Sequence, residues 1–171
     1  MSNATTTGSG LKRLIMGGSL ARTLLRVSLL ILTVVVALRW VVLPLRVSGD
    51  SMLPTLQDGQ ICLGSRLAFR KAGPERGEIV AIDIAGGRQF LLKRIVGLPG
   101  ERFAIQNGNI LIDGKPLAEP YVQFPGKDWN RNEILLQEDE YYFIGDNRSM
   151  PMRDHTTDVV KRSRIVARIQ P

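Results

Sequence analysis

Ser51 and Lys93 are the two residues whose types and surroundings best suit nucleophilic catalysis. Ser51 lies in a Gly-Asp-Ser turn, and Pro54 keeps this turn from continuing as a helix. In the apolar segment around Lys93, the alternation of a strand places Leu91, Lys93 and Ile95 on one face. Burial there would favour the neutral amine, and lowering its pKa from ~10.4 to ~7.5 corresponds to roughly 4 kcal/mol. We therefore predict that Lys93 takes the proton from the Ser51 hydroxyl, the ordinary alternative being a lysine that reaches solvent or pairs with an acid.

His155 offers a second way to activate a serine, because histidine is the usual base in such sites. It is the only histidine of the chain and lies in the polar segment RDHTT, at residues 153–157. The sequence does not exclude a triad of Ser51, His155 and an aspartate, but no further motif supports one.

Four segments of the chain together resemble the successive motifs of type I signal peptidases. They are VSGDSMLPT (47–55), RGEIV (76–80), KRIVGLPGE (93–101) and GDNRS (145–149). They occur in the order of that family, behind a long apolar segment, and extend over most of the remaining chain. The resemblance implies a Ser/Lys endopeptidase with a mainly antiparallel β fold that removes signal peptides from exported preproteins. It implies no metal ion and no organic cofactor.

The same resemblance assigns roles to individual residues. Ser51 is the expected nucleophile, Lys93 the expected general base, and the Ser51 backbone N–H an expected oxyanion-hole donor. Some members carry a second donor, a serine, where this chain has Gly49, so that donor is left unidentified. Five apolar residues match positions that line the family's substrate pockets, although ordinary core packing would account for them equally well: Val47, Met52, Leu56, Leu91 and Leu92.

The last motif departs from the family's commoner pattern. After Gly-Asp-Asn-Arg, members often have Ser-x-Asp-Ser-Arg, in which the serine and aspartate help to orient the lysine, whereas this chain has PMRDH at residues 151–155. Whether Ser149 or Asp154 takes over that role is left open. For Asp146 and Arg148 we predict a structural rather than a catalytic role, since Asp-Asn turns hydrogen-bond their own backbone.

An apolar segment at residues 24–45 precedes the first motif. As a helix it would be roughly 33 Å long, which is enough to cross a bilayer core, and we predict a single transmembrane anchor there. Residues 1–23 would form a flexible, basic, cytoplasmic N-terminus, and residues 46–171 a peptidase domain outside the cytoplasm. Lys12, Arg13, Arg22 and Arg26 on the N-terminal side of the anchor indicate this orientation in the inner membrane.

The distribution of charge separates membrane association from nucleic-acid binding. The net charge is +7, but no acidic residue precedes Asp50, and the six Lys and Arg residues before it account for most of the excess. The basic character therefore belongs to the anchor and its flanks, and no nucleic-acid partner is expected. Cys62 is the only cysteine, so no internal disulfide can form.

After residue 60 the apolar residues follow a period of two, with frequent Gly, Pro and Asn, which predicts a mainly β domain of antiparallel strands. Asn107-Gly108 predicts a type I′ hairpin, and residues 117–132 read as an excursion between strands of undefined fold. The predicted strands are 61–65, 78–84, 89–96, 102–106, 109–112, 141–144 and 164–169.

These expectations describe a membrane-bound signal peptidase. Its partners would be preprotein signal peptides, membrane lipid and a nearby secretion machinery. A peptidase of the same superfamily that processes pilin for conjugative transfer is one alternative. Another is a catalytically inactive, membrane-tethered β domain that binds exported chains, which the altered last motif makes worth considering.

Overall fold

The structure, a computed structural model, describes residues 20–170, so most of the predicted cytoplasmic N-terminus at 1–23 lies outside the described residues. The chain divides into two units, the first ending at Trp40 and the second beginning at Val41.

The first unit is represented by one α-helix, α2 (Leu20–Val41). Its stretch Arg22–Val41 is long and apolar enough to cross a membrane by length and composition, which agrees with the predicted helix. The helix ends at Val41, however, and not at the predicted Leu45, because strand β1 (Val42–Arg46) begins there. Pro44 cannot donate a helical hydrogen bond and disfavours helical geometry at the residue before it, so the chain changes to a strand.

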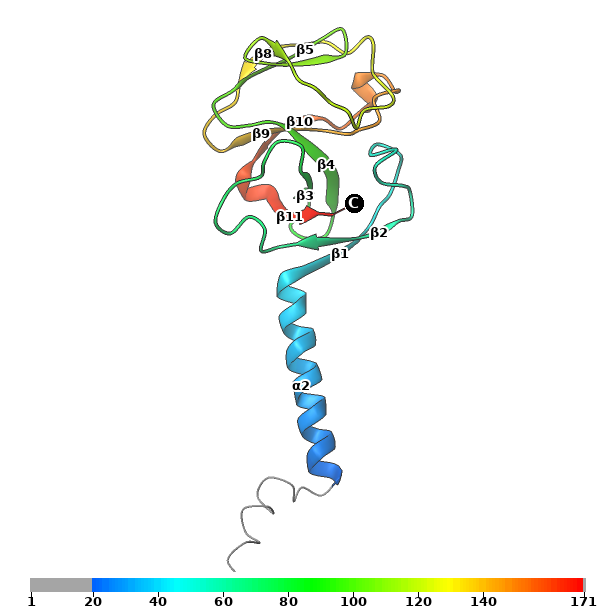
Figure 1. Cartoon of the computed structure of the whole chain (residues 1–171), viewed down its shortest axis with the longest axis vertical. Coiled ribbons are helices and arrows are strands. Elements are labelled where there is room, and N and C mark those ends of the chain that lie inside the picture. Colours follow the sequence, from blue (N-terminus) through cyan, green and yellow to red (C-terminus); the bar gives the residue numbers. More distant parts are fainter. Residues whose placement is uncertain (1–19, 171) are drawn as a thin grey trace, which may run out of the picture. The chain divides into compact units, whose positions relative to one another are not determined.

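The second unit is built on an antiparallel sheet of seven strands and a smaller one of four (Figure 1). The large sheet has the order β1, β2 (Ile61–Ser65), β11 (Ile165–Ile169), β3 (Ile79–Asp83), β4 (Phe90–Gly97), β9 (Glu140–Ile144) and β10 (Asp158–Lys161). The small sheet has the order β7 (Lys115–Pro116), β6 (Asn109–Ile112), β5 (Arg102–Gln106) and β8 (Arg131–Leu135). The predicted mainly β, antiparallel fold is confirmed.

All seven predicted strands are present, with ends that differ from the predicted ones by at most one residue. Strands β1, β7, β8 and β10 were not predicted. The predicted hairpin at Asn107-Gly108 joins β5 to β6, and both residues have positive φ, 48° and 80°, as a type I′ turn requires.

Apolar side chains of both sheets meet in one core cluster. Phe103 of β5 stacks on Tyr142 of β9, with ring centroids 3.7 Å apart. Trp129, from the excursion at 117–132, is buried in the same cluster. A second cluster contains Met52 and Leu56, which follow Ser51 directly. The Ser51 turn is therefore fixed to the β domain by the two buried side chains that come after it.

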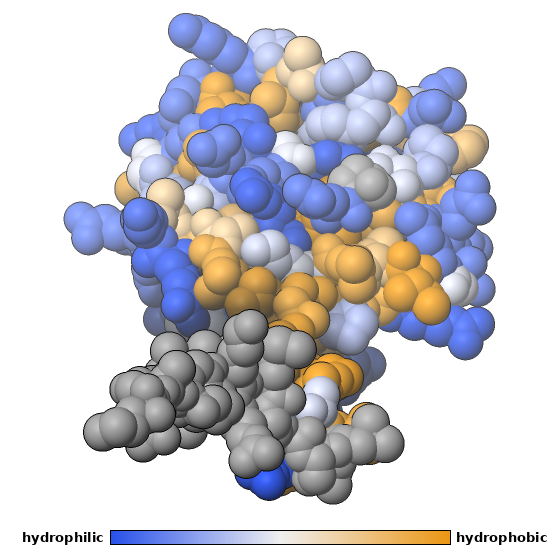
Figure 2. All heavy atoms as spheres, turned by 60° about the horizontal axis from the view of Figure 1, so that its bottom comes forward, coloured by the Kyte–Doolittle hydropathy of each residue, from blue (hydrophilic) through white to orange (hydrophobic). Residues whose placement is uncertain are grey.

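Polar and apolar side chains are unevenly distributed on the surface. Figure 2 shows hydrophobic residues gathered in one part of the viewed face, while hydrophilic residues cover most of the rest. On β2, Ile61 and Leu63 project outward with 74% and 59% of their surface exposed, because the alternating residues Cys62 and Gly64 face the core.

Candidate active site

The turn that carries Ser51 is fixed by backbone hydrogen bonds at both ends. The Val47 N–H donates to the Gln60 carbonyl at 2.8 Å, and the Gly59 N–H returns a bond to the Val47 carbonyl at 3.0 Å. Between them, Gly49 has φ of +90°, a conformation that L side chains rarely adopt, and donates its N–H to the Asp58 carboxylate at 2.8 Å. The Gly49 N–H is therefore occupied and is not free to act as the second oxyanion donor.

Lys93 lies on β4, paired with Val80 of β3, and only 4% of its surface is exposed. Ser51 and Lys93 line one small pocket of about 100 Å³. Four of the five predicted substrate-binding residues, Val47, Met52, Leu91 and Leu92, line this pocket as well. Leu56 does not line it, because this side chain is completely buried in the core cluster below the turn.

Gly145 explains how Lys93 and the Ser51 turn come together. Arg94 of β4 pairs with Ile144 of β9, and this register, continued by one residue, places Lys93 opposite Gly145. Opposite residues of antiparallel strands project to the same face of a sheet. A Cβ on Gly145 would lie 2.3 Å from the Ser51 carbonyl oxygen, so only glycine allows the turn to approach β4 and β9 this closely.

Burial lowers the pKa of Lys93 from its ordinary value of 10.5 to about 8, while the Asp146 carboxylate acts in the opposite direction. At neutral pH a substantial fraction of this amine is therefore neutral and able to accept a proton. A neutral amine and a serine hydroxyl that line one pocket are the two groups that nucleophilic acyl transfer requires.

The last motif, residues 145–149, binds the Ser51 turn through hydrogen bonds of Asn147. The Asn147 N–H donates to the Ser51 carbonyl at 3.0 Å, and the Asn147 side-chain amide donates to the Asp50 carbonyl at 3.1 Å. Ser149 donates its hydroxyl to the Asn147 side chain at 2.8 Å. Because Ser149 is engaged by Asn147, the structure gives it a role in shaping this loop and no contact with Lys93.

Asp146 is completely buried, and its carboxylate is held by two side chains. Arg94 donates to it from Nε at 2.8 Å and from Nη2 at 2.6 Å, and Thr55 donates its hydroxyl at 2.5 Å. Since Thr55 belongs to the Ser51 turn and Arg94 to β4, Asp146 joins the turn that carries Ser51 to the strand that carries Lys93. A bidentate arginine–carboxylate pair of this kind is strong and directional.

A second buried ion pair attaches the excursion at 117–132 to the last motif. Arg148 donates to both carboxylate oxygens of Glu119, at 2.7 and 2.5 Å. Tyr121 donates its hydroxyl to Glu119 at 2.9 Å, and its ring lies 3.9 Å from the Arg94 guanidinium. These contacts agree with the predicted structural role of Asp146 and Arg148.

Asp154 does not lie in this network. It ends the short 3₁₀ helix η1 (Met152–Asp154), its side chain is 47% exposed, and its nearest charged partner is its neighbour Arg153 at 3.8 Å. Next to it, His155 is 91% buried, and neither ring nitrogen has a hydrogen-bond partner within the described residues. Five residues of the site were not predicted as such from the sequence: Thr55, Arg94, Glu119, Tyr121 and Asn147. His155 had been considered only as an alternative base.

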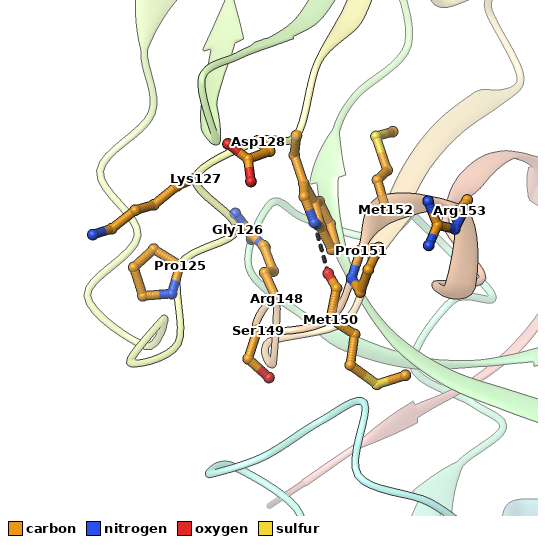
Figure 3. A pocket seen from close by; sticks show the side chains of 11 residues that line it. Pro125, Gly126, Lys127, Asp128, Arg148, Ser149, Met150, Pro151, Met152 and Arg153 are labelled. Atoms are coloured by element: carbon orange, nitrogen blue, oxygen red, sulfur yellow. Dashed lines mark hydrogen bonds between the residues drawn. The ribbon is translucent and has the colours of Figure 1, made fainter.

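A cavity of about 590 Å³ lies between residues 125–129 and residues 148–153, and neither Ser51 nor Lys93 lines it (Figure 3). Trp129 and Met150 both line it, and the Trp129 indole N–H donates a hydrogen bond to the Met150 carbonyl at 2.9 Å. Among residues 20–170, no group of three or more His, Cys, Asp or Glu side chains has the arrangement of a metal site. The pocket with Ser51 and Lys93 is small, but it contains both the expected nucleophile and the expected base.

The profile of the family described as "Signal peptidase, peptidase S26" matches residues 20–171. The chain belongs to this family. The resemblance of the four sequence motifs to signal peptidases is thereby confirmed. In the last motif, where the sequence departs from the pattern expected from the resemblance, the structure buries His155.

Named relatives of this signal peptidase family member come from several bacteria. A "Probable signal peptidase I-2" of Synechocystis sp. is 32% identical over 128 residues, which cover 71% of this chain and 58% of that protein. A "Signal peptidase I" of Leptolyngbya laminosa is 31% identical over 130 residues, 71% of this chain and 64% of that protein. A "Signal peptidase IB" of Staphylococcus aureus (strain N315) is 25% identical over 148 residues, 77% of each chain. This chain thus spans less than two thirds of the length of the first two relatives.

Proposed function

We propose that the chain is a membrane-anchored endopeptidase that removes N-terminal signal peptides from exported preproteins, with Ser51 as nucleophile and Lys93 as general base. The observation that carries the proposal is the placement of the Ser51 and Lys93 side chains on one small pocket, with the lysine only 4% exposed. Membership of the signal peptidase family supports the substrate class.

In the first half of the proposed reaction, the neutral Lys93 amine takes the proton from the Ser51 hydroxyl as its oxygen attacks the scissile carbonyl carbon. The carbonyl oxygen becomes an oxyanion, to which the Ser51 backbone N–H donates. When the intermediate collapses, the carbon–nitrogen bond breaks and the Lys93 ammonium gives its proton to the leaving amine. The products are a mature protein with a new N-terminus and a signal peptide esterified to Ser51.

In the second half, a water molecule attacks the ester carbonyl and Lys93 takes a proton from it. The bond to the Ser51 oxygen then breaks, the proton returns to that oxygen, and the signal peptide leaves as a free carboxylate. Both halves use the same amine, alternating between its neutral and charged forms. A pKa of about 8 for Lys93 suits this alternation, because both forms are accessible near neutral pH.

The pocket also suggests which residues of the substrate are recognised. It is small, and Val47, Met52, Leu91 and Leu92 contribute to its lining. Side chains of the size of alanine fit such a space better than large ones, and the cost of overpacking provides the selection. We therefore propose that small residues precede the cleaved bond.

The anchor and its charges suggest where the reaction takes place. Helix α2 carries no acidic residue in its first turn, and the Lys and Arg residues at its N-terminal side favour the cytoplasm. We place the β unit on the extracytoplasmic side of the inner membrane, where it would meet preproteins beside the lipid surface and the secretion machinery.

The experiment that tests this function is cleavage of a preprotein that has alanine at the first and third positions before the cut. The detergent-solubilised full chain should release the mature product, and Ser51→Ala and Lys93→Ala should each abolish the release. Ser163→Ala is a matched control, because Ser163 is an exposed serine that does not line the pocket of Ser51 and Lys93. Full activity in either Ser51→Ala or Lys93→Ala would exclude this pair of residues as the catalytic groups.

The same experiment addresses the alternatives. An inactive binding domain would retain the preprotein without releasing a mature product. A peptidase specialised for pilin would cleave a pilin precursor and leave a general secretory precursor intact. Both precursors should therefore be assayed side by side.

A further inference from the structure

The imidazole of His155 is buried, and neither ring nitrogen meets the geometry of a hydrogen bond, although the Asn147 backbone lies close enough to act on its pKa. Its two ring nitrogens, Nδ1 and Nε2, are inaccessible to solvent and find no partner in the described part of the chain. Leaving a buried polar atom unsatisfied destabilises the fold, so such a group calls for a functional explanation. An apolar side chain would fill the same space without that cost.

The location of His155 connects it to the site. If Gly145 carried a Cβ atom, that atom would lie 3.2 Å from Cε1 of the His155 ring and 2.3 Å from the Ser51 carbonyl oxygen. Lys93 is opposite Gly145 in the continued register of β4 and β9, on the same face of the sheet. Thus Lys93, Ser51 and His155 converge on the space that the missing side chain of Gly145 leaves free.

The segment that carries His155 is held in place independently of the site. The indole N–H of Trp129 donates to the Met150 carbonyl at 2.9 Å, drawn as a dashed line in Figure 3. The Trp129 and His155 rings meet edge to face with centroids 4.9 Å apart. The backbone N–H of His155 donates to the Met152 carbonyl at 3.0 Å. The imidazole is therefore fixed by its backbone and by an aromatic neighbour.

The charges around His155 favour its neutral form. Burial lowers its pKa, the positive charges of Lys93 on β4 and Arg148 on the last motif lower it further, and the Asn147 backbone acts in the opposite direction. Asp146 is engaged by Arg94, and Glu119 by Arg148, so neither acid is free to pair with the imidazole. A neutral imidazole has one ring nitrogen that accepts a hydrogen bond.

We propose that His155 is a positioning residue for Lys93: when the amine turns toward the Ser51 hydroxyl, it donates a hydrogen bond to the imidazole, which is unpartnered in the described structure, and its lone pair is thereby directed at that hydroxyl. This inference rests on the proposed function of Ser51 and Lys93. Among the described residues it supplies an orienting group that neither Ser149, bonded to Asn147, nor the exposed Asp154 provides.

The test compares His155→Leu, which keeps an apolar side chain in the space, with His155→Gln, which keeps a hydrogen-bond acceptor. Both are prepared as the full chain in detergent and assayed for kcat and KM on the alanine-containing preprotein. The leucine variant should lose about 100-fold in kcat with little change in KM, because a displaced base affects the chemical step. The glutamine variant should recover at least about tenfold of that loss. Arg153→Ala is the matched control, since this neighbour is 82% exposed and should behave as wild type.

The pH profile gives a readout that packing alone would not move. A hydrogen bond from Lys93 to His155 is stronger when the lysine is charged, so its loss should lower the pKa of Lys93 and shift the rising limb of kcat to lower pH. Titration of ¹³C-labelled lysine by NMR in the Ser51→Ala background measures the same pKa without catalysis. A downward shift with His155→Leu supports the proposal even if no preprotein is cleaved, which would contradict only the proposed function.

Wild-type kcat together with an unshifted Lys93 titration in the folded leucine variant would overturn the proposal. So would equal loss in the leucine and glutamine variants, because that result indicates a packing role. Thermal denaturation shows whether each variant is folded. If the leucine variant does not fold, His155→Met serves as the apolar member of the comparison.

Discussion

Varying the pH of the cleavage assay perturbs the one ionisation on which the proposed chemistry depends. Burial lowers the pKa of Lys93 from 10.5 to about 8. With a pKa of about 8, roughly one amine in ten is neutral at pH 7, whereas with the ordinary value only about three in 10,000 would be. The burial of this side chain therefore increases the amount of active base about 300-fold at pH 7.

The assay is kcat/KM for preprotein cleavage between about pH 6 and about pH 10, because this parameter reports ionisations of the free enzyme. It should rise about tenfold for each pH unit below 8 and become constant above about pH 9. The pKa of His155 is lowered, so its titration lies on the acidic side of this range. Lys93→Arg is the matched variant, and it should be inactive at every pH because its guanidinium does not lose a proton.

Two results would refute this reasoning. A flat profile across the range would show that no amine titrates in the rate-limiting chemistry. A profile that still rises at pH 10 would show that the lysine keeps its ordinary pKa and is not desolvated in the free enzyme. The preprotein should carry no ionisable residue beside the cleaved bond, so that the rise of kcat/KM with pH can be assigned to a group of the enzyme.

Three further predictions concern stability and the shape of the site. The folded-state pKa of Lys93 is below its unfolded value, so the unfolded chain binds more protons between pH 8 and pH 10.5, and the stability of the wild type rises with pH there. Lys93→Met has no amine to titrate and should be the more stable protein at pH 7. Its excess free energy of unfolding over the wild type should shrink by about 3 kcal/mol between pH 7 and pH 11. Asp146→Asn should cost about 3–5 kcal/mol by leaving a buried arginine unpaired, whereas Arg102→Ala, which breaks an exposed pair, should cost less than about 1 kcal/mol in chemical denaturation. Gly145→Ala should lower both Tm and kcat, while Gly97→Ala, whose Cβ would lie 2.7 Å from a core leucine, should lower Tm and leave the kcat of the folded fraction unchanged.

Each of these three comparisons has an outcome that contradicts it. A stability difference between Lys93→Met and wild type that is independent of pH would mean that the lysine is not desolvated. Equal costs for Asp146→Asn and Arg102→Ala would mean that the Asp146 pair is not buried in solution. Wild-type kcat in Gly145→Ala would mean that the Ser51 turn tolerates displacement.

The strands that the sequence predicts are those in which a regular apolar alternation coincides with turn residues. The hairpin around Asn107-Gly108 is an example, because both its strands and its turn carry local signals. Strand β1 gave no such signal, since its residues continue the apolar run of α2 and hydropathy alone does not separate a helix from a strand. Strand β8 is largely exposed and polar, and the two apolar residues of β10, Val159 and Val160, are adjacent, so neither strand shows the apolar alternation that would mark it.

The residues of the site also fall into those that a local sequence motif predicts and those that depend on contacts between distant parts of the chain. The motifs of the sequence indicated Ser51 and Lys93, and the structure places both on one pocket. The partners of Asp146 were not predictable, because Thr55 and Arg94 lie 91 and 52 residues away in the chain and their contacts depend on the sheet register. His155 was expected in a polar loop, but Trp129, from a different part of the chain, covers it.

The neutral state of Lys93 depends on how the neighbouring acid is occupied. Among the described residues, Asp146 is the carboxylate whose charge acts on this lysine, and a direct ion pair between them would raise the pKa of Lys93 and remove the base. Arg94 prevents this by holding Asp146 with two hydrogen bonds, and Thr55 adds a third. Because adjacent residues of a strand project to opposite faces, Arg94 can satisfy the acid while Lys93 points to the pocket. The buried arginine thus leaves the amine of Lys93 without a counter-ion, so that the lysine is available for its proposed role as a base near neutral pH.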